Sequence, residues 1–500
     1  MDPQNLERRR RFLLLASAVA AAGAAVGVVS CQQPQGMRPA PGSPAGGGAK
    51  QPAGGTSAEP TPSKTTGDKT TSGESKPAAE KDKPKPQPVE RPAPPSSEPT
   101  IRIKTGSLPK GAARIEITGP GPEVWIVERG SGRPGTVAAS PVRFEWTDAG
   151  WRVTEAVDTR DPRIVAVPAR AELDVAPLRG EPRQLTAFGS TWPGTIRLVP
   201  QPNDPDNPVD VVHDVPMEAY LPGVIAKELF NGWGVATHCA QAIAARSWAL
   251  CEMAMWRTRR HFDAVAGEQG QAWIGATAHK RSLDAVAATR GETLVYASRV
   301  VPAYYSSCCG GARAAARDAI STSVVNDIAP LAVSGSDGRD CCSWSPTYQW
   351  QASFDAAAFA RTLPVWARAE GYASLFKVDG IRRVEVAERN KAGRPVVFTI
   401  TDAKGAPFQV LAERLRWALN ADPRNPQNLR PAKERVKSAN FEPFLKASGK
   451  TSELVISGRG HGHGVGMCQY GAEAMAKKGA TMAAILARYY PGASIEKSYA

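Results

Sequence analysis

Apolar and polar residues alternate over short stretches between residues 100 and 212. Alternation with a period of two places the apolar side chains on one face of a β-strand. Turns rich in Gly, Pro, Asp and Asn separate these stretches, notably at residues 119–122 and 203–207. The pattern predicts an antiparallel β module, with strands near residues 101–104, 113–117, 124–127 and 151–153.

From residue 215 the spacing becomes helical. Residues 221–229 predict a helix with Pro222 near its first position, which would also end any helix that began earlier. After a break at Asn231 and Gly232, residues 235–256 predict one long Ala-rich helix. Its expected apolar stripe comprises Val235, Cys239, Ala242, Arg246, Ala249 and Met253. A buried guanidinium needs an acidic or carbonyl partner, so Arg246 is expected to be either a structural clamp or a substrate-facing group.

Glycine occupies every second position from Gly458 to Gly466. If this segment is extended, the five glycines line one strand face, and the opposite face carries Arg459, His461, His463 and Val465. Such a bare face would let another backbone or a polymer approach closely.

Two helices are expected after this segment and strands before it. The first helix should end at Gly479, and Thr481 should cap a second one. Residues 376–417 have strand character. The fold class is therefore α+β, an antiparallel β-rich body with a helical segment.

The first 31 residues have the organisation of an export signal. Four arginines precede an apolar run at residues 12–29, and the run ends in Val-Val-Ser-Cys at 28–31. This ending resembles the bacterial lipobox, in which Cys31 would be lipidated. Residues 9–13 resemble a twin-arginine signal. A permanent transmembrane anchor is the alternative. We expect an exported lipoprotein of the cell envelope, anchored to a membrane and facing the periplasm or cell wall.

Residues 32–99 lack Phe, Trp, Tyr, Ile and Leu and contain 15 of the 43 prolines. A segment of this composition cannot bury enough apolar surface to offset its ordering entropy. We therefore predict a disordered linker between the signal and the folded body.

Composition and charge narrow the function classes. With 500 residues, 42% of them hydrophobic, the chain can build large cores, and a mean hydropathy of −0.32 excludes a polytopic membrane protein. The net charge of +14 favours polyanionic partners. No nucleic-acid-binding pattern accompanies the charge, and an export signal argues against nucleic acid as a partner.

Four segments, in order, resemble the stage II sporulation protein D/LytB family. Residues 215–228 (VPMEAYLPGVIAKE) resemble its opening motif, and residues 240–250 (AQAIAARSWAL) the helix that follows. Residues 304–311 (YYSSCCGG) resemble its central turn. Residues 460–472 (GHGHGVGMCQYGA), with Tyr-Tyr-Pro-Gly at 489–492, resemble its terminal motif.

The resemblance implies peptidoglycan as the substrate. Sporulation members of the family are lytic transglycosylases that cleave glycan strands stripped of peptides, forming anhydro-muramic ends; others are amidase enhancers. It places the catalytic acid at Glu228. The alternative function is a non-catalytic modifier that binds peptidoglycan or a cell-wall amidase.

Lytic transglycosylation needs one carboxyl group that starts protonated and then accepts a proton from the sugar. Glu228 would need a raised pKa, for which its apolar sequence neighbours from Val224 to Phe230 are candidates. Glu218 is the competing carboxyl group. As substrate-binding residues we expect Gln241, Arg246, Ser306, Ser307, His463, Gln469 and Tyr470.

Metal binding stays an open alternative. No cofactor is required by this chemistry. His461 and His463 have the spacing of a ligand pair, although an aromatic residue often replaces the first in the family. Some members hold zinc with a Thr-Thr-His-Cys-Gln stretch, of which residues 267–271 (GEQGQ) keep only the last Gln. The cysteines Cys308, Cys309, Cys341 and Cys342 are expected to form disulfides, to stay free or to bind zinc.

These patterns give a domain organisation. It consists of a signal (1–31), a linker (32–99), a β-rich module (100–212) and a SpoIID/LytB-like domain (213–500). Within the last we expect a helical catalytic core (213–320), a β insert (350–450) and the Gly/His motif (456–497).

Overall fold

The computed structural model describes residues 90–156, 163–180, 183–267, 270–333, 335, 341–448 and 451–500. The predicted export signal with Cys31, and the predicted linker up to residue 89, lie outside these residues. Among the described helices, none combines the length and the apolar character needed to cross a membrane.

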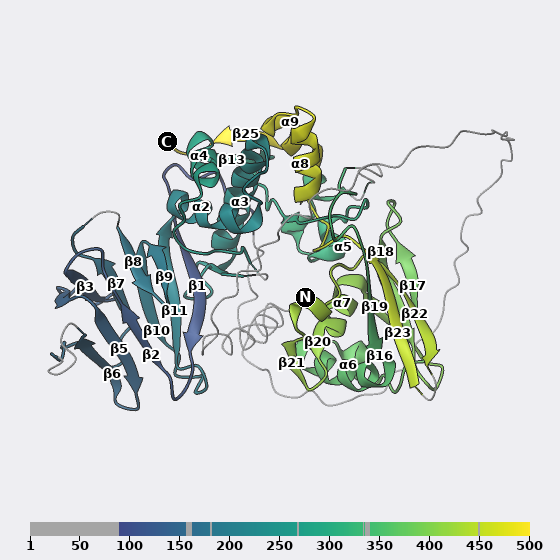
Figure 1. Ribbon diagram of the computed structural model, residues 1–500, viewed down its shortest axis with the longest axis horizontal. Coiled ribbons are helices and arrows are strands. Elements are labelled where there is room, and N and C mark those ends of the chain that lie inside the picture. The colour runs from purple at the N-terminus through teal and green to yellow at the C-terminus, as the bar shows by residue number, and fades with distance from the viewer. Residues whose placement is uncertain are drawn as a thin grey trace, which may run out of the picture. The chain divides into compact units, whose positions relative to one another are not determined.

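The predicted antiparallel β module is present. Its largest sheet comprises β1 (Thr100–Leu108), β3 (Glu123–Glu128), β4 (Thr136–Ala139), β7 (Leu173–Pro177), β10 (Thr195–Pro200), β11 (Val209–Pro216) and β12 (Ala264–Val265). The strand order is β12–β1–β11–β10–β7–β3–β4, with only the β1–β12 pair parallel (Figure 1). Ile101 and Ile103 are buried while Arg102 between them is half-buried, which confirms the alternation.

Smaller sheets complete this module. One comprises β2 (Arg114–Ile117), β5 (Val142–Thr147) and β6 (Gly150–Glu155). A hairpin of β8 (Gln184–Ala187) and β9 (Ser190–Pro193) is the other. The module shares one hydrophobic core with the helices that follow it, and β11 runs across the predicted boundary at residue 212.

The first of the two predicted helices begins earlier than expected, and the second has the expected bounds but a different pattern of burial. Helix α2 spans Met217–Glu228, so it starts before Pro222 and continues through it. Helix α3 spans Val235–Trp256, as predicted. The predicted single stripe is wrong, because α3 is buried on almost every side while Val235 is exposed. Alanine side chains let α2, α4 (Lys280–Ala288), α8 (Gln469–Lys477) and α9 (Met482–Tyr489) pack closely around it.

Ordered structure begins before residue 100. Arg91 donates to the carbonyl oxygens of Tyr296 and Arg299, each at 3.0 Å. Met217 N donates to Pro99 O at 3.0 Å. The last part of the predicted linker is therefore bound to the folded body.

A second hydrophobic core corresponds to the predicted insert at 350–450. One sheet has the order β16–β23–β22, and the other β17–β18–β19. Two helices accompany them, so the insert is not purely β. The elements are β16 (Gln349–Asp355), α6 (Ala356–Glu370), β17 (Arg383–Arg389), β18 (Pro395–Thr401), β19 (Pro407–Leu411), α7 (Ala412–Asn420), β22 (Phe441–Ser448) and β23 (Thr451–Arg459).

The predicted extended glycine strand is wrong. Strand β23 ends at Arg459, and Gly460, Gly462, Gly464 and Gly466 all have positive φ, between 65° and 93°. Each glycine turns the chain and packs against a neighbour: a Cβ on Gly462 would lie 2.8 Å from Ser306 Cβ. The alternation reflects repeated left-handed backbone, a conformation that glycine adopts at low cost.

The C-terminal helices confirm the capping prediction. The chain enters β24 (Met467–Cys468), which pairs in parallel with β15 (Tyr305–Ser306). Helices α8 (Gln469–Lys477) and α9 (Met482–Tyr489) follow, and the Thr481 side chain caps α9. Strand β25 (Ser494–Lys497) pairs with β13 (Glu292–Tyr296).

Candidate functional site

A cleft of about 540 Å³ contains the predicted acid Glu228. Glu228 is the last residue of α2. The apolar lining comes from Trp248, Met255, Ile320 and Trp417. These residues belong to three segments far apart in the sequence, brought together by folding.

Glu228 is held by two hydrogen bonds. The backbone N–H of Ala272 donates to Oε1 at 3.3 Å, and Gln469 Nε2 donates to Oε2 at 3.0 Å. Burial raises the pKa of Glu228 above its ordinary value, and the two hydrogen bonds only partly offset this effect. The position at the carboxyl end of α2 acts in the same direction, because the helix dipole disfavours negative charge there.

The predicted cause of this raised pKa needs correction. Val224, Ile225 and Leu229 point into the main hydrophobic core, and Phe230 is exposed. The apolar groups in the same cleft as the carboxyl come instead from α3, from Ile320 and from the insert. Sequence neighbours on a helix point in different directions, so they could not all face one group.

Gln469 is the residue that positions Glu228. As the first residue of α8 it donates both to Glu228 and, at 3.4 Å, to Gln241 Oε1 on α3. Gln241 is fully buried, and its Nε2 has no hydrogen-bond partner among the described residues. Gln469 and Gln241, both predicted as substrate-binding residues, are thus joined to Glu228 by a chain of hydrogen bonds.

Ser306, Ser307 and His463 also line the cleft, as predicted. Ser306 Oγ is buried and has no hydrogen-bond partner among the described residues, so it is available to a ligand. His463 Nδ1 accepts the Val465 backbone N–H at 3.0 Å. Burial lowers the pKa of His463 to about 4, so the ring is neutral at pH 7. With Nδ1 occupied, His463 does not pair with His461 as a metal ligand through that atom.

Arg246 and Tyr470 lie elsewhere. Arg246 is fully buried and makes a bidentate ion pair with Glu218, at 2.9 and 2.7 Å, and a bond to Glu292 O. Of its two alternatives, the geometry favours the structural clamp. The centroid of the Tyr470 ring lies 5.0 Å from that of Trp233 and 4.6 Å from that of Trp344. The three rings form an aromatic cluster, and Tyr470 is not part of the cleft lining.

The competing carboxyl, Glu218, has the opposite electrostatics. Burial tends to raise its pKa, but the Arg246 hydrogen bonds and charge, with Tyr499 and the Gly291 N–H, lower it overall. Glu218 is therefore an ionised clamp group and Glu228 the residue suited to carry a proton.

The cleft contains functional groups that sequence reasoning missed. Glu252 on α3 lines it and accepts a hydrogen bond from Trp256 Nε1 at 3.0 Å. Arg414 and Arg416 of α7 also line it, and Arg416 makes an ion pair with the buried Glu413 at 2.7 Å. No local pattern links the two arginines to Glu228, because α7 belongs to the separate insert.

No disulfide joins any of the described cysteines. The sulfur atoms of Cys309, Cys342 and Cys468 lie within 4.8 Å of one another and form a candidate metal-binding group. Cys341 is not part of it, and Cys468 was not among the predicted four.

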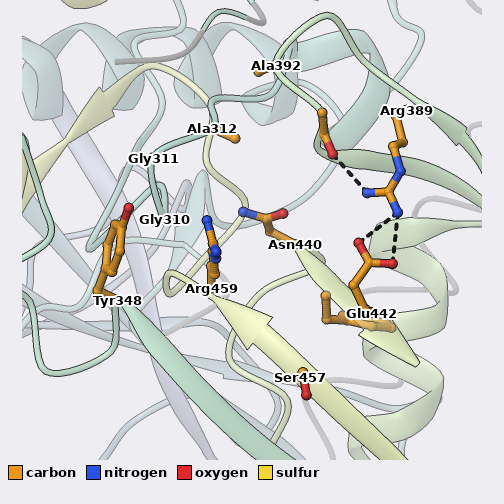
Figure 2. A pocket seen from close by; sticks show the side chains of 12 residues that line it. Gly310, Gly311, Ala312, Tyr348, Arg389, Ala392, Asn440, Glu442, Ser457 and Arg459 are labelled. Carbon is orange, nitrogen blue, oxygen red and sulfur yellow. Dashed lines mark hydrogen bonds and ion pairs between the residues drawn. The ribbon is translucent and has the colours of Figure 1, made fainter. Parts of the chain in front are cut away.

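A second pocket, of about 320 Å³, lies at the edge of the insert, as Figure 2 shows. Arg389 spans part of it through an ion pair with Glu442 at 2.7 Å and a hydrogen bond to Gly393 O. Tyr348, Asn440 and Arg459 also line it. Its lining does not include the acid or the residues that hold it.

The fold and cleft define an α+β protein with a buried carboxyl group of raised pKa at the end of a helix. Residues 206–296, which include α2 and α3, match the family described as "SpoIID: Stage II sporulation protein". Two of the four motifs, at residues 215–228 and 240–250, lie within the matched range, and for these the match confirms the resemblance to the SpoIID/LytB family.

Named relatives agree with this assignment. The chain is 28% identical over 304 residues to a Stage II sporulation protein D of Bacillus subtilis, an alignment that covers 57% of this chain and 76% of the relative. It is 27% identical over 365 residues to the protein of that name in Bacillus amyloliquefaciens, covering 67% and 92%. It is 24% identical over 294 residues to the Amidase enhancer of Bacillus subtilis, covering 55% and 40%.

Proposed function

We propose that this protein remodels peptidoglycan in the cell envelope, and that it is a lytic transglycosylase with Glu228 as its acid and base. The observation that carries the proposal is the raised pKa of Glu228 in a cleft. A carboxyl group that retains its proton nearer to neutral pH can donate it to a leaving oxygen.

The reaction balances with one carboxyl group. Glu228 donates its proton to the glycosidic oxygen while the bond from that oxygen to the muramic C1 breaks. The resulting carboxylate then accepts the proton of the muramic C6 hydroxyl, whose oxygen bonds to C1. The product is a 1,6-anhydro ring, and no water is consumed.

The surroundings of Glu228 suit both steps. Gln469 and the Ala272 N–H fix the carboxyl and stabilise its charged form after the first transfer. The free Ser306 hydroxyl is placed to bind a sugar hydroxyl or N-acetyl group. Arg414 provides positive charge for carboxylates along a peptide-free strand, whereas the charge of Arg416 is largely compensated by Glu413.

A second candidate function has its own support. One relative is named Amidase enhancer, so binding to peptidoglycan or to an amidase without cleavage is the alternative. Under that alternative the cleft binds glycan and Glu228 transfers no proton.

Incubation of the full chain with peptide-free glycan strands separates the two. We expect anhydro-muramic products by mass spectrometry, and Glu228→Gln should lower their rate of formation by about 100- to 10,000-fold. Glu388→Gln makes the same change at an exposed site and should have no effect. Glu252→Gln tests the second carboxyl of the cleft and should retain activity.

The opposite outcome is equally clear. If the wild type releases no anhydro product but stimulates a cell-wall amidase, and Glu228→Gln stimulates it equally, the transglycosylase proposal is wrong.

A further inference from the structure

Four buried cysteine side chains converge beside the cleft. Cys308 and Cys309 follow β15, Cys342 lies in the loop before β16, and Cys468 is the N-cap of α8. The sulfur atoms of Cys309, Cys342 and Cys468 lie within 4.8 Å of one another, and the Cys308 thiol lies beside this group and donates to Cys342 O at 3.8 Å. Three chain segments thus place their sulfur atoms around one point.

The spacing of these sulfur atoms fits a metal ion. Cys309 Sγ and Cys342 Sγ are 3.6 Å apart. A disulfide would bring them to about 2.05 Å. Four thiolates around one tetrahedral ion with Zn–S bonds of about 2.3 Å are about 3.8 Å apart, so the observed distance matches the second arrangement.

Backbone N–H groups point at the sulfur of Cys468. The N–H of Cys309 donates to it at 3.3 Å, and that of Gly471 at 3.4 Å. Both are bonds to an acceptor sulfur, as expected of a thiolate ligand with its supporting hydrogen bonds. Cys468 also stands at the positive end of the α8 dipole, which favours negative charge.

We propose a structural zinc site in which the thiolates of Cys309, Cys342 and Cys468 bind one ion, and rotation of the Cys308 side chain supplies the fourth thiolate. Binding releases the protons of the four thiols as Zn²⁺ enters. Cys341, one of the four cysteines that the sequence offered for disulfides or a zinc site, is not a ligand in this proposal.

A buried cation lies next to this site. Zn²⁺ with four thiolates has a net charge of −2, which is costly to bury without compensation. The guanidinium of Arg394 is buried and donates to Cys309 O at 3.4 Å and to His463 O at 3.0 Å. Glu413, at 3.7 Å from Arg394, reduces but does not remove its effect.

The site fixes groups of the cleft without touching substrate. Cys468 directly precedes Gln469, which holds Glu228, and Cys308 directly follows Ser306 and Ser307. The ion would therefore position both sides of the cleft. This inference concerns metal binding and stands independently of the proposed function.

Metal analysis of the full chain tests the site. We expect about one zinc ion per chain after purification without chelator, and substitution of Cys309, Cys342 or Cys468 by Ala should reduce zinc to background. Cys341→Ala and Cys251→Ala are matched controls, since one is adjacent and the other is a buried cysteine of α3, and both should retain full zinc.

Cobalt replacement keeps the test valid if the Ala variants fail to fold. The wild type loaded with Co²⁺ should show the intense thiolate-to-cobalt charge-transfer absorption of a tetrahedral sulfur site. Four thiols should become reactive to alkylation only after chelator is added. A wild type without bound metal, whether its thiols are free or Cys309 is bonded to Cys342, would overturn the proposal; so would iron in place of zinc.

Discussion

Two glutamates on one helix illustrate how position decides chemistry. Glu218 at the start of α2 is tied to Arg246, whereas Glu228 at its end faces the cleft and accepts hydrogen bonds from two neutral donors of the described chain, Gln469 Nε2 and Ala272 N. Burial acts on both carboxyls, but the guanidinium lowers the pKa of the first and nothing comparable lowers that of the second. Chemistry that needs a proton belongs to Glu228.

The protonated form of Glu228 sets the pH dependence. Because the acid must carry a proton, kcat/KM on glycan strands should fall by about tenfold per pH unit above its pKa. The raised pKa places this fall above the ordinary range of a glutamate. A pH–rate profile measures it, and a rate that rises through the same range would contradict the role.

Gln469 should tune that profile. Gln469→Leu removes a donor that stabilises the carboxylate, so the pKa of Glu228 should rise further and the alkaline limb should move to higher pH. The rate should also drop, because the carboxyl loses its orientation. A merely structural defect would lower the rate without moving the limb.

At the scale of elements, the segment from Gly460 to Gly466 joins the two cores. Its glycines adopt left-handed backbone so that the chain passes close to Ser306 and Arg394. A Cβ on Gly464 would lie 2.6 Å from the guanidinium of Arg394, which also bonds His463 O.

Gly464→Ala should therefore destabilise the fold. We expect about 2 kcal/mol or more from backbone strain and displacement of a buried cation together. Gly479→Ala is the control, since Gly479 has a similar φ of 85° but open space around it, and should show the strain alone, about 1 kcal/mol. Urea unfolding measures the stability of both variants. Equal losses of unfolding free energy would show that the Arg394 side chain moves aside at no cost.

The clamp between α2 and α3 is a second element-scale feature. Arg246→Met leaves Glu218 buried without its partner, and should reduce the free energy of unfolding by about 3–5 kcal/mol. Lys280→Met removes an exposed ion pair with Asp284 and should cost less than about 1 kcal/mol.

The clamp also gives a pH dependence of stability. The folded-state pKa of Glu218 is lowered, so its contribution is present above the ordinary glutamate pKa and is lost as pH falls through the folded value. The free energies of unfolding of the wild type and of Arg246→Met should therefore become equal in acid. A constant gap between them would contradict the assignment.

At the scale of the whole molecule, the folded body includes residues that composition alone would exclude. The segment 91–99 is Pro-rich, yet Glu98 makes an ion pair with Arg290 and accepts the Glu218 N–H at 3.0 Å. Pro92 O accepts from Val300 N at 2.8 Å. Specific contacts with the body hold a segment that lacks a hydrophobic pattern.

Truncation tests this boundary. A chain that begins at residue 90 should unfold at the same temperature as the full chain. A chain that begins at residue 101 loses these bonds and should be less stable by at least about 1 kcal/mol, measured by thermal unfolding. Equal stability of the two truncated chains would show that the segment does not contribute.

The sequence predicted what local physics controls. Helix α3 and the Thr481 cap follow from helix formers between Gly234 and Arg257 and from a hydroxyl at an N-terminus. The glycine alternation misled, because a period of two is shared by strands and by repeated left-handed turns. The bond between Gln469 and Glu228 joins segments far apart in sequence, and no local pattern records it.

Cleavage of peptide-free glycan strands in water enriched in ¹⁸O tests the central claim most directly. The account predicts anhydro-muramic ends without ¹⁸O from the wild type, and formation of these products about 100- to 10,000-fold more slowly from Glu228→Gln. Reducing ends that contain ¹⁸O would show attack by water, and would contradict a mechanism in which Glu228 passes one proton between two sugar oxygens.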